Sequence, residues 1–105
     1  MHDLTAFQRD QLYVIAGLDG ARGVRIQDEL EKYYMDDVQP GRLYPNLDKL
    51  VEKGLVNKEP INDRANSYSP TRRALRTLDA RDEWEAQYVH RTEDDPGVAS
   101  ASMDD

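Results

Sequence analysis

The stretch from Pro40 to Gly54 constrains the fold of this chain more than any other. Proline is favoured at the first turn of a helix, where its missing N–H would have no partner, and glycine is favoured just past the last residue. At 100° per residue, Leu43, Leu47 and Leu50 share one face of the segment between them. The sequence therefore predicts an amphipathic helix over about residues 40–53 that needs neighbouring elements to cover its leucines.

Two further helices are predicted ahead of this segment. Thr5 and Gln8 have the spacing of a capping box, in which each side chain satisfies a free backbone N–H of the other. The helix that they begin is stopped by Asp19-Gly20. A second helix is predicted over about residues 24–34, with an apolar stripe formed by Ile26, Leu30 and Tyr33.

A hairpin and a last helix follow Gly54. Residues 55–59 and 66–69 read as two short strands around a turn at 60–65, and Thr71 can cap a long helix over about 71–91. Residues 92–105 hold almost nothing to bury, so we expect a disordered acidic tail. The predicted fold is mainly α with a small β-hairpin wing (α+β). Its domains are a winged helix-turn-helix over 1–70, a C-terminal helix over 71–91 and the tail.

The charge of the chain is unevenly distributed. The total is −7, with 21 acidic against 14 basic side chains, and aspartate and arginine outnumber glutamate and lysine. Such an acidic, lysine-poor surface stays hydrated where salt screens ordinary charge effects, so we expect a halophilic protein. Residues 39–76, however, carry eight basic and four acidic side chains. This basic third includes the predicted third helix and the hairpin, and it favours an anionic partner.

Composition also excludes several classes of protein. There is no cysteine, so disulfides and thiolate metal sites are excluded. His2 and His90 are the two histidines, and neither has a nucleophile or a second metal ligand at useful spacing. We expect no enzyme activity, no catalytic residue, no metal and no cofactor. With neither an apolar run long enough to cross a membrane nor a signal peptide, we expect a cytoplasmic protein.

Several segments resemble the PadR family of transcriptional regulators. PGRLYPNLDKLVEKGLV at 40–56 is similar to the family's recognition-helix signature. Weaker similarities lie at Leu4–Gln8, Gly23–Ile26 and Arg64–Thr71, so that the resemblance covers roughly residues 4–78. Val24 and Ala74 depart from the aromatic residue and the glycine usual there. The single helix after the hairpin resembles the smaller members of the family, which occur in haloarchaea. The resemblance implies a DNA-binding regulator of transcription.

The predicted contacts with double-stranded operator DNA follow from helix-turn-helix geometry. The third helix (about 40–53) is expected to enter the major groove, where arginine or lysine pairs with guanine and asparagine with adenine. The wing (about 57–69) is expected on the backbone or in the minor groove. The candidate residues are Arg42, Tyr44, Asn46, Lys49 and Lys53 in the helix, Asn62, Arg64, Asn66 and Ser67 in the wing, and Arg72 and Arg73 just beyond. Asp48 and Glu52 occupy the other flank of the helix.

The last helix is interpreted as a long C-terminal dimerisation helix. Aromatic side chains beyond a compact domain usually mark a partner surface, and the predicted homodimer interface comprises Phe7, Leu78, Trp84, Tyr88 and Val89. The alternative is that these side chains fold back onto their own domain. A small-molecule effector beside Trp84 is possible but not indicated. A second function class also stays open, a winged helix that binds other proteins in a transcription or chromosome-maintenance complex, although the basic third favours DNA.

Overall fold

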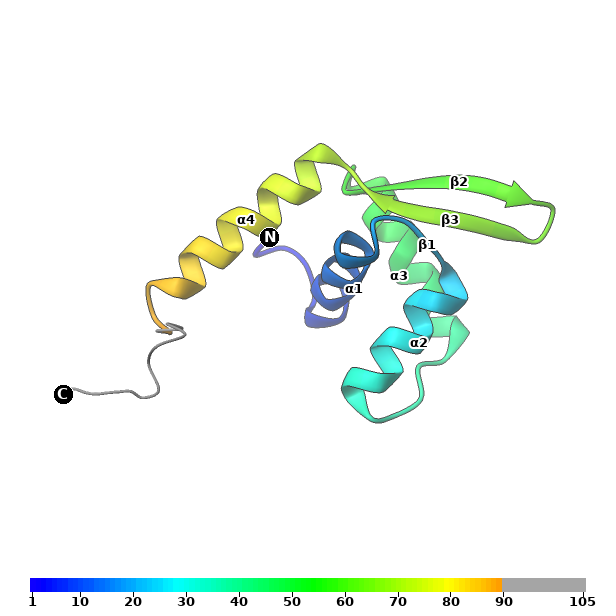
Figure 1. The fold of residues 1–105 in the computed structure, drawn as a ribbon, viewed down its shortest axis with the longest axis horizontal. Coiled ribbons are helices and arrows are strands. Elements are labelled where there is room, and N and C mark those ends of the chain that lie inside the picture. Colours follow the sequence, from blue (N-terminus) through cyan, green and yellow to red (C-terminus); the bar gives the residue numbers. More distant parts are fainter. Residues whose placement is uncertain (90–105) are drawn as a thin grey trace.

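A computed structural model describes residues 1–89 of the chain. The end of the last predicted helix, at 90–91, and the predicted tail at 92–105 lie outside the described residues. The order of elements is helix, short strand, two helices, hairpin and helix (Figure 1). The bounds are α1 Ala6–Leu18, β1 Ala21–Arg22, α2 Gly23–Tyr34, α3 Pro40–Glu52, β2 Val56–Asn62, β3 Ala65–Pro70 and α4 Arg72–Ala86.

The ends of α1 are fixed by the residues that the sequence indicated. The Gln8 N–H donates to Thr5 Oγ1 and the Thr5 N–H donates to Gln8 Oε1, each over 3.1 Å, so the capping box is complete. At the other end Asp19 takes a left-handed backbone with φ of 53°, and its N–H donates to the carbonyls of Ile15 and Ala16. Gly20 follows with φ of 105°, a conformation that costs glycine little. The predicted start and stop of this helix are therefore confirmed.

The apolar stripe of α2 was predicted wrongly at its last turn. Ile26 and Leu30 are buried, but Tyr33 is 78% exposed. Tyr34 packs inward instead, with its ring 6.2 Å from the Phe7 ring and its hydroxyl donating to Asp10 Oδ2 over 2.6 Å. Burial, together with this carboxylate, raises the pKa of Tyr34 well above its usual value. The stripe alone does not show which of its two flanks the neighbouring helix covers, and here α1 covers the flank of Tyr34.

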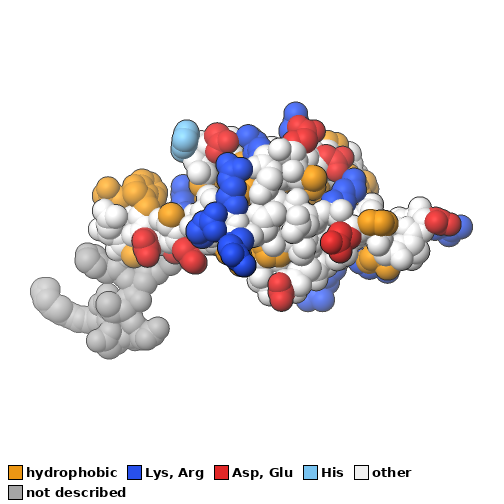
Figure 2. All heavy atoms as spheres, turned by 90° about the horizontal axis from the view of Figure 1, so that it is seen from above, with side chains coloured by type: hydrophobic (Ala, Val, Ile, Leu, Met, Phe, Trp, Pro, Cys, Tyr) orange, Lys and Arg blue, Asp and Glu red, His pale blue; other side chains and the backbone are white. Residues whose placement is uncertain are grey.

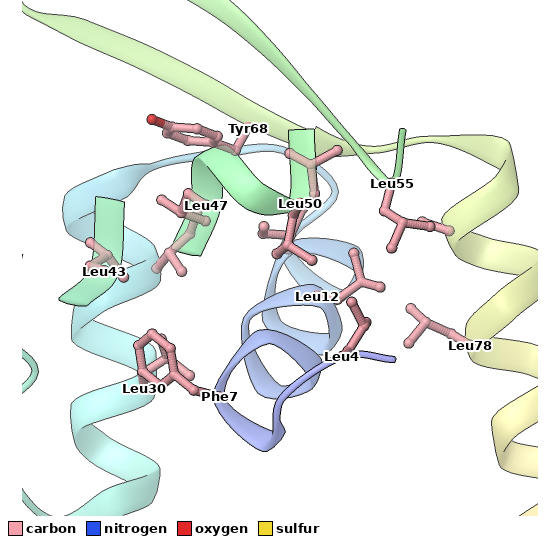
Figure 3. Packing of buried hydrophobic residues seen from close by; sticks show 14 of the residues in the cluster. Leu4, Phe7, Leu12, Leu30, Leu43, Leu47, Leu50, Leu55, Tyr68 and Leu78 are labelled. Atoms are coloured by element: carbon pink, nitrogen blue, oxygen red, sulfur yellow. The ribbon is translucent and has the colours of Figure 1, made fainter. Parts of the chain in front are cut away.

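The leucine face of α3 is the centre of the core, as predicted. Leu43, Leu47 and Leu50 are completely buried. They meet side chains from α1, α2, the sheet and the first half of α4 (Figure 3). The other core residues are Leu4, Phe7, Leu12, Ile15, Ile26, Leu30, Val38, Leu55, Val56, Tyr68, Ala74 and Leu78. Burial of each large aliphatic or phenylalanine side chain among them contributes about 1.5–3 kcal/mol, which fixes α3 on the domain with its polar side outward.

The sheet is larger than predicted. Its strand order is β1-β3-β2 and both pairings are antiparallel. The two-residue strand β1 was not predicted, and it pairs Ala21 with Tyr68 and Arg22 with Ser67. The hairpin ladder also extends into the predicted turn at 60–65, because Pro60 pairs with Asn66 and Asn62 pairs with Ala65. Only Asp63 and Arg64 form the connection, so the wing is a long two-stranded arm (Figure 1).

The last helix begins in the domain and then leaves it. Thr71 caps α4 by accepting the N–H of Ala74 over 3.0 Å, as expected. The helix ends at Ala86, five residues before the predicted end, so Tyr88 lies beyond it. The helix projects away from the other elements (Figure 1). None of the described helices is long and apolar enough to cross a membrane.

Candidate DNA-binding surface

One flank of α3 is held by α1. The Arg42 guanidinium lies over the Phe7 ring, 4.0 Å from its centroid. The Asn46 side chain accepts a hydrogen bond from Gln8 Nε2 over 3.0 Å and donates to the Arg42 carbonyl over 2.8 Å. Both ends of the Asn46 amide are engaged within the chain, which fixes the orientation of the side chain and leaves one acceptor site and one N–H for other partners. Asn46 therefore serves, in this structure, to hold α3 against α1.

The two lysines of α3 lie in different surroundings. Lys49 is exposed at the middle of the polar side and approaches Glu52 to 3.9 Å. Lys53 lies at the C-terminal end of the helix, where its Nζ contacts Asp3 Oδ2 over 3.1 Å. This contact lowers the pKa of the Asp3 carboxyl. Arg73 Nη1 donates to the Lys53 carbonyl over 2.8 Å, which ties the start of α4 to the end of α3. Lys53 and Arg73 thus lie at the opposite end of α3 from Tyr44.

The predicted wing residues occupy the hairpin and its tip. Asn62 Oδ1 accepts the backbone N–H of Arg64 over 2.8 Å, a side-chain turn that fixes the connection and leaves Arg64 exposed at the tip. Asn66 and Ser67 are half-buried on β3. Arg72 is exposed at the start of α4, and basic side chains form a band over the first half of that helix (Figure 2).

A polar cavity joins three of these elements. It has a volume of about 190 Å³ and lies between the start of α2, the polar side of α3 and the hairpin. Of the predicted contacts it brings together Tyr44, Arg64 and Asn66. It also contains Arg22 and Lys58, which were not predicted as contacts. Lys58 belongs to the basic third at 39–76, but the sequence alone does not give the hairpin register that turns it toward α3.

The charges inside this cavity are partly paired. Lys58 Nζ contacts Asp48 Oδ1 over 3.1 Å, and this hydrogen bond is the main reason that the pKa of Lys58 is raised. Arg22 and Arg64 have no carboxylate of residues 1–89 within 4.0 Å. With three basic side chains and one acidic side chain in its lining, the cavity is electropositive. It can attract an anion, and it lies between the two elements predicted to contact DNA.

Tyr44 is seated on the start of α2 because residue 23 is a glycine. A Cβ placed on Gly23 would lie 2.5 Å from Tyr44 Cε1 and 2.7 Å from its hydroxyl oxygen, which is closer than real Cβ contacts come. The glycine lets the ring rest directly on the backbone between β1 and α2. This contact fixes the position of α3 relative to α2, and the cavity includes both residues.

The substitution Gly23→Ala is therefore expected to displace the Tyr44 ring and lower the free energy of unfolding by about 1–3 kcal/mol, as overpacking does. The matched control is Gly41→Ala, because nothing lies within 4 Å of a Cβ at that helical position. Alanine there is expected to stabilise α3 by about 0.5–1 kcal/mol. Urea unfolding of both variants measures the difference. Equal stabilities of the two would contradict the seating of Tyr44 on Gly23.

Phe7 and Leu78 were predicted wrongly as dimer-interface residues. Each is 5% exposed in the single chain, and both belong to its core (Figure 3). The other three predicted interface residues are exposed: Trp84 at 51%, Tyr88 at 68% and Val89 at 49%. They form a hydrophobic patch at the far end of α4 (Figure 2). Among residues 1–89, no three acidic or histidine side chains are grouped so as to hold a metal ion.

Helices α1, α2 and α3 form a core that the β2–β3 hairpin follows, and a basic cavity lies between α2, α3 and the hairpin. This arrangement is that of the winged-helix class of DNA-binding proteins. The sequence model of the PadR-like family of transcriptional regulators matches residues 12–79. The chain belongs to this PadR-like family, and it is a DNA-binding transcription regulator rather than an enzyme.

Solved structures agree with this assignment. A complex of hsRosR superposes with a TM-score of 0.81 at 42% identity, covering 89% of this chain and 82% of that one. The structure of H. salinarum RosR grown from NaBr superposes with a TM-score of 0.80 at 42% identity, covering 87% of this chain and 83% of that one. The protein F93 from STIV, a winged-helix DNA-binding protein, is 17% identical and shares the fold, with a TM-score of 0.67 and 86% and 100% covered. No curated protein sequence matches the chain.

Proposed function

We propose that the protein binds double-stranded operator DNA as a homodimer, with α3 in the major groove and the β2–β3 wing on the backbone or in the minor groove. The observation that carries this proposal is the electropositive cavity between α3 and the wing, which joins the two contacting elements on one side of the domain. Two recognition helices related by a two-fold axis read half-sites about 34–36 Å apart. The operator is therefore expected to be an inverted repeat.

The dimer proposal is supported by apolar surfaces that one chain leaves uncovered. The Trp84 and Tyr88 rings lie 5.3 Å apart and expose most of their joint surface at the end of α4. A mainly apolar hollow of about 430 Å³ lies between α1 and α2, lined by Tyr13, Val14, Gly17, Leu18, Leu30 and Tyr33 among others. Exposed apolar patches of this kind mark protein interfaces. A second copy of the chain, which brings the same patch and the same hollow, covers both kinds of surface at once.

Helix α4 then belongs to two units, which refines the domain boundary predicted at residue 70. Its first half contributes Ala74 and Leu78 to the core of its own domain. Its second half carries Trp84 beyond that core, and Tyr88 follows just after the helix. The proposed division is a winged-helix domain that includes the start of α4, and a dimerisation segment from the middle of α4 onward.

Lys49 tests the placement of α3. The substitution Lys49→Ala is expected to weaken binding to the preferred DNA sequence by about 1–3 kcal/mol, the discrimination that one good base contact provides. Folding should be unaffected, because Lys49 is exposed and contacts only Glu52 at the limit of an ion pair. The control is Lys32→Ala, an exposed lysine of α2 that pairs with Asp28 and Glu29. Anisotropy titrations with labelled operator compare the two variants with the wild type. Equal affinities of Lys49→Ala and Lys32→Ala would contradict the assignment of α3 as recognition helix.

The function as a whole is tested by mapping bound sites across the genome and repeating the binding with purified protein at near-native salt. Recovered sites that share an inverted repeat, and that compete specifically in gel-shift assays, are the expected result. Binding that is independent of sequence, combined with capture on other transcription proteins, would favour the protein-interaction class instead.

A further inference from the structure

The cavity between α2, α3 and the hairpin contains a tyrosine hydroxyl group with no hydrogen-bond partner in the described part of the chain. Tyr68 is 2% exposed, and its ring belongs to the core. Its hydroxyl oxygen points away from the leucine cluster (Figure 3), and Tyr68 is part of the cavity lining. No hydrogen bond within residues 1–89 involves this hydroxyl, and its oxygen is not among the unpartnered side-chain atoms that are sealed from solvent. The ring is held by the core while the hydroxyl oxygen stays accessible from the cavity, where it can donate a hydrogen bond to a ligand.

A second, independent feature of the cavity is the start of α2. The N-cap residue Arg22 makes no side-chain capping bond, and no acidic residue stands in the first turn. The first backbone N–H groups of this twelve-residue helix, at Gly23 and Val24, therefore have no cap, and the helix dipole makes this end attractive to an anion. Gly23 and Val24 both line the cavity.

The remaining lining completes a site for a phosphate group. Arg22, Lys58 and Arg64 supply positive charge, and the Tyr44 ring lies against Gly23 within reach of the same space. Asp48 is the one acidic side chain in the lining, and Lys58 already pairs with it. The volume of about 190 Å³ far exceeds the roughly 10–15 Å³ that a single water needs.

We propose that this cavity binds one phosphate group of the DNA backbone, held by the Tyr68 hydroxyl, the N–H groups at the start of α2 and the surrounding basic side chains. This inference rests on the proposed function. A phosphate fixed there is contacted by α2 and the wing together, and it sets how deeply and in which register α3 enters the groove. Tyr68 is in this sense a positioning residue for DNA recognition.

The substitution Tyr68→Phe removes the hydroxyl and keeps the ring. Affinity for a labelled duplex of about 30 base pairs is expected to fall by about tenfold, the loss expected for one hydrogen bond to a charged group. The free energy of unfolding should not fall, because the hydroxyl has no partner in the protein. The control is Thr77→Val, which removes a hydroxyl on α4 that lies outside the cavity and donates to the Arg73 carbonyl. The measurements are fluorescence anisotropy at fixed salt and urea unfolding.

The outcomes separate this proposal from the proposed function. Wild-type protein that binds no DNA would overturn both. Wild-type binding that Tyr68→Phe leaves unchanged would overturn the phosphate site alone, and so would a loss of affinity matched by a loss of stability. A third arm titrates inorganic phosphate into the protein without DNA and follows the amide NMR signals of Gly23 and Val24. Saturable shifts there, together with unchanged DNA affinity of Tyr68→Phe, would assign the cavity to a free anion and overturn its role with DNA.

Discussion

Truncation of Trp84 or Tyr88 to alanine is expected to convert the protein from dimer to monomer at micromolar concentration. The two rings are exposed in the single chain and contact each other at the end of α4, so in the proposed dimer they become buried together. Removing a buried aromatic anchor costs about 2 kcal/mol or more of interface free energy, which weakens the dimer by about 30-fold or more. Light scattering and sedimentation at several concentrations measure the change.

The loss of the dimer is expected to be amplified in DNA binding. A monomer engages one half-site, so affinity for the inverted repeat should fall steeply although neither residue contacts DNA in the proposed complex. The control is Ile61→Ala, because Ile61 is comparably exposed but lies on β2, far along the wing. That variant should remain a dimer. Unchanged mass of Trp84→Ala and Tyr88→Ala, at concentrations where the wild type is dimeric, would contradict the interface at the end of α4.

Local signals in the sequence were sufficient for the helices that they describe. The capping box of Thr5 and Gln8 and the left-handed Asp19 act within a few residues, and both ends of α1 follow from them. The three leucines of α3 are spaced so that one face is apolar whatever covers it. The strand β1 has no such signal. It exists because β3 offers an unpaired edge to residues 21–22, a relation across about 45 positions of sequence.

The hairpin shows how a correct local rule can give a wrong boundary. The sequence predicts Pro60 as the first residue of a turn, since proline and the Asn62-Asp63 pair are typical of turns. The strand order β1-β3-β2 places β2 at the edge of the sheet, where proline is tolerated, and a register irregularity follows it between Pro60 and Asn62. The ladder therefore continues almost to the tip. Which strand lies at the edge is a property of the sheet, and the sequence of β2 alone does not contain it.

The sequence predicts several residues of the site, but it does not predict which residues they contact. Tyr44, Arg64 and Asn66 do gather at one cavity. Asn46 was predicted to read bases, yet its amide is engaged by Gln8, 38 positions away in the chain. Tyr68 was part of the resemblance to the family, but a tyrosine in a strand gives no indication that its hydroxyl faces a cavity. These relations depend on how α1, α2 and the hairpin pack around α3.

The dependence of DNA affinity on salt is expected to differ from that of ordinary DNA-binding proteins. A protein that neutralises six to ten phosphates loses roughly 10³–10⁵ in affinity between 50 and 200 mM salt, because the entropy gained by releasing cations falls as bulk salt rises. This chain carries −7 overall, and the acidic residues Asp48, Glu52, Glu59 and Asp63 are exposed on α3 and the wing. Bringing carboxylates close to phosphates requires cations between them. Cation uptake on binding then offsets cation release, so affinity should depend weakly on KCl in the molar range, or rise with it.

The loop between α2 and α3 allows this balance to be changed. Asp36 and Asp37 are exposed there, just ahead of the start of the recognition helix. Replacing both by asparagine should reduce cation uptake and make the slope of log affinity against log KCl more negative. The control makes the same change of charge on α4, with Asp79→Asn and Glu83→Gln, where the side chains are exposed away from α3 and the wing. Titrations at several KCl concentrations compare the slopes. A steep loss of affinity in the wild type, left unchanged by the loop substitutions, would mean that the acidic residues act on solubility alone and take no part in DNA binding.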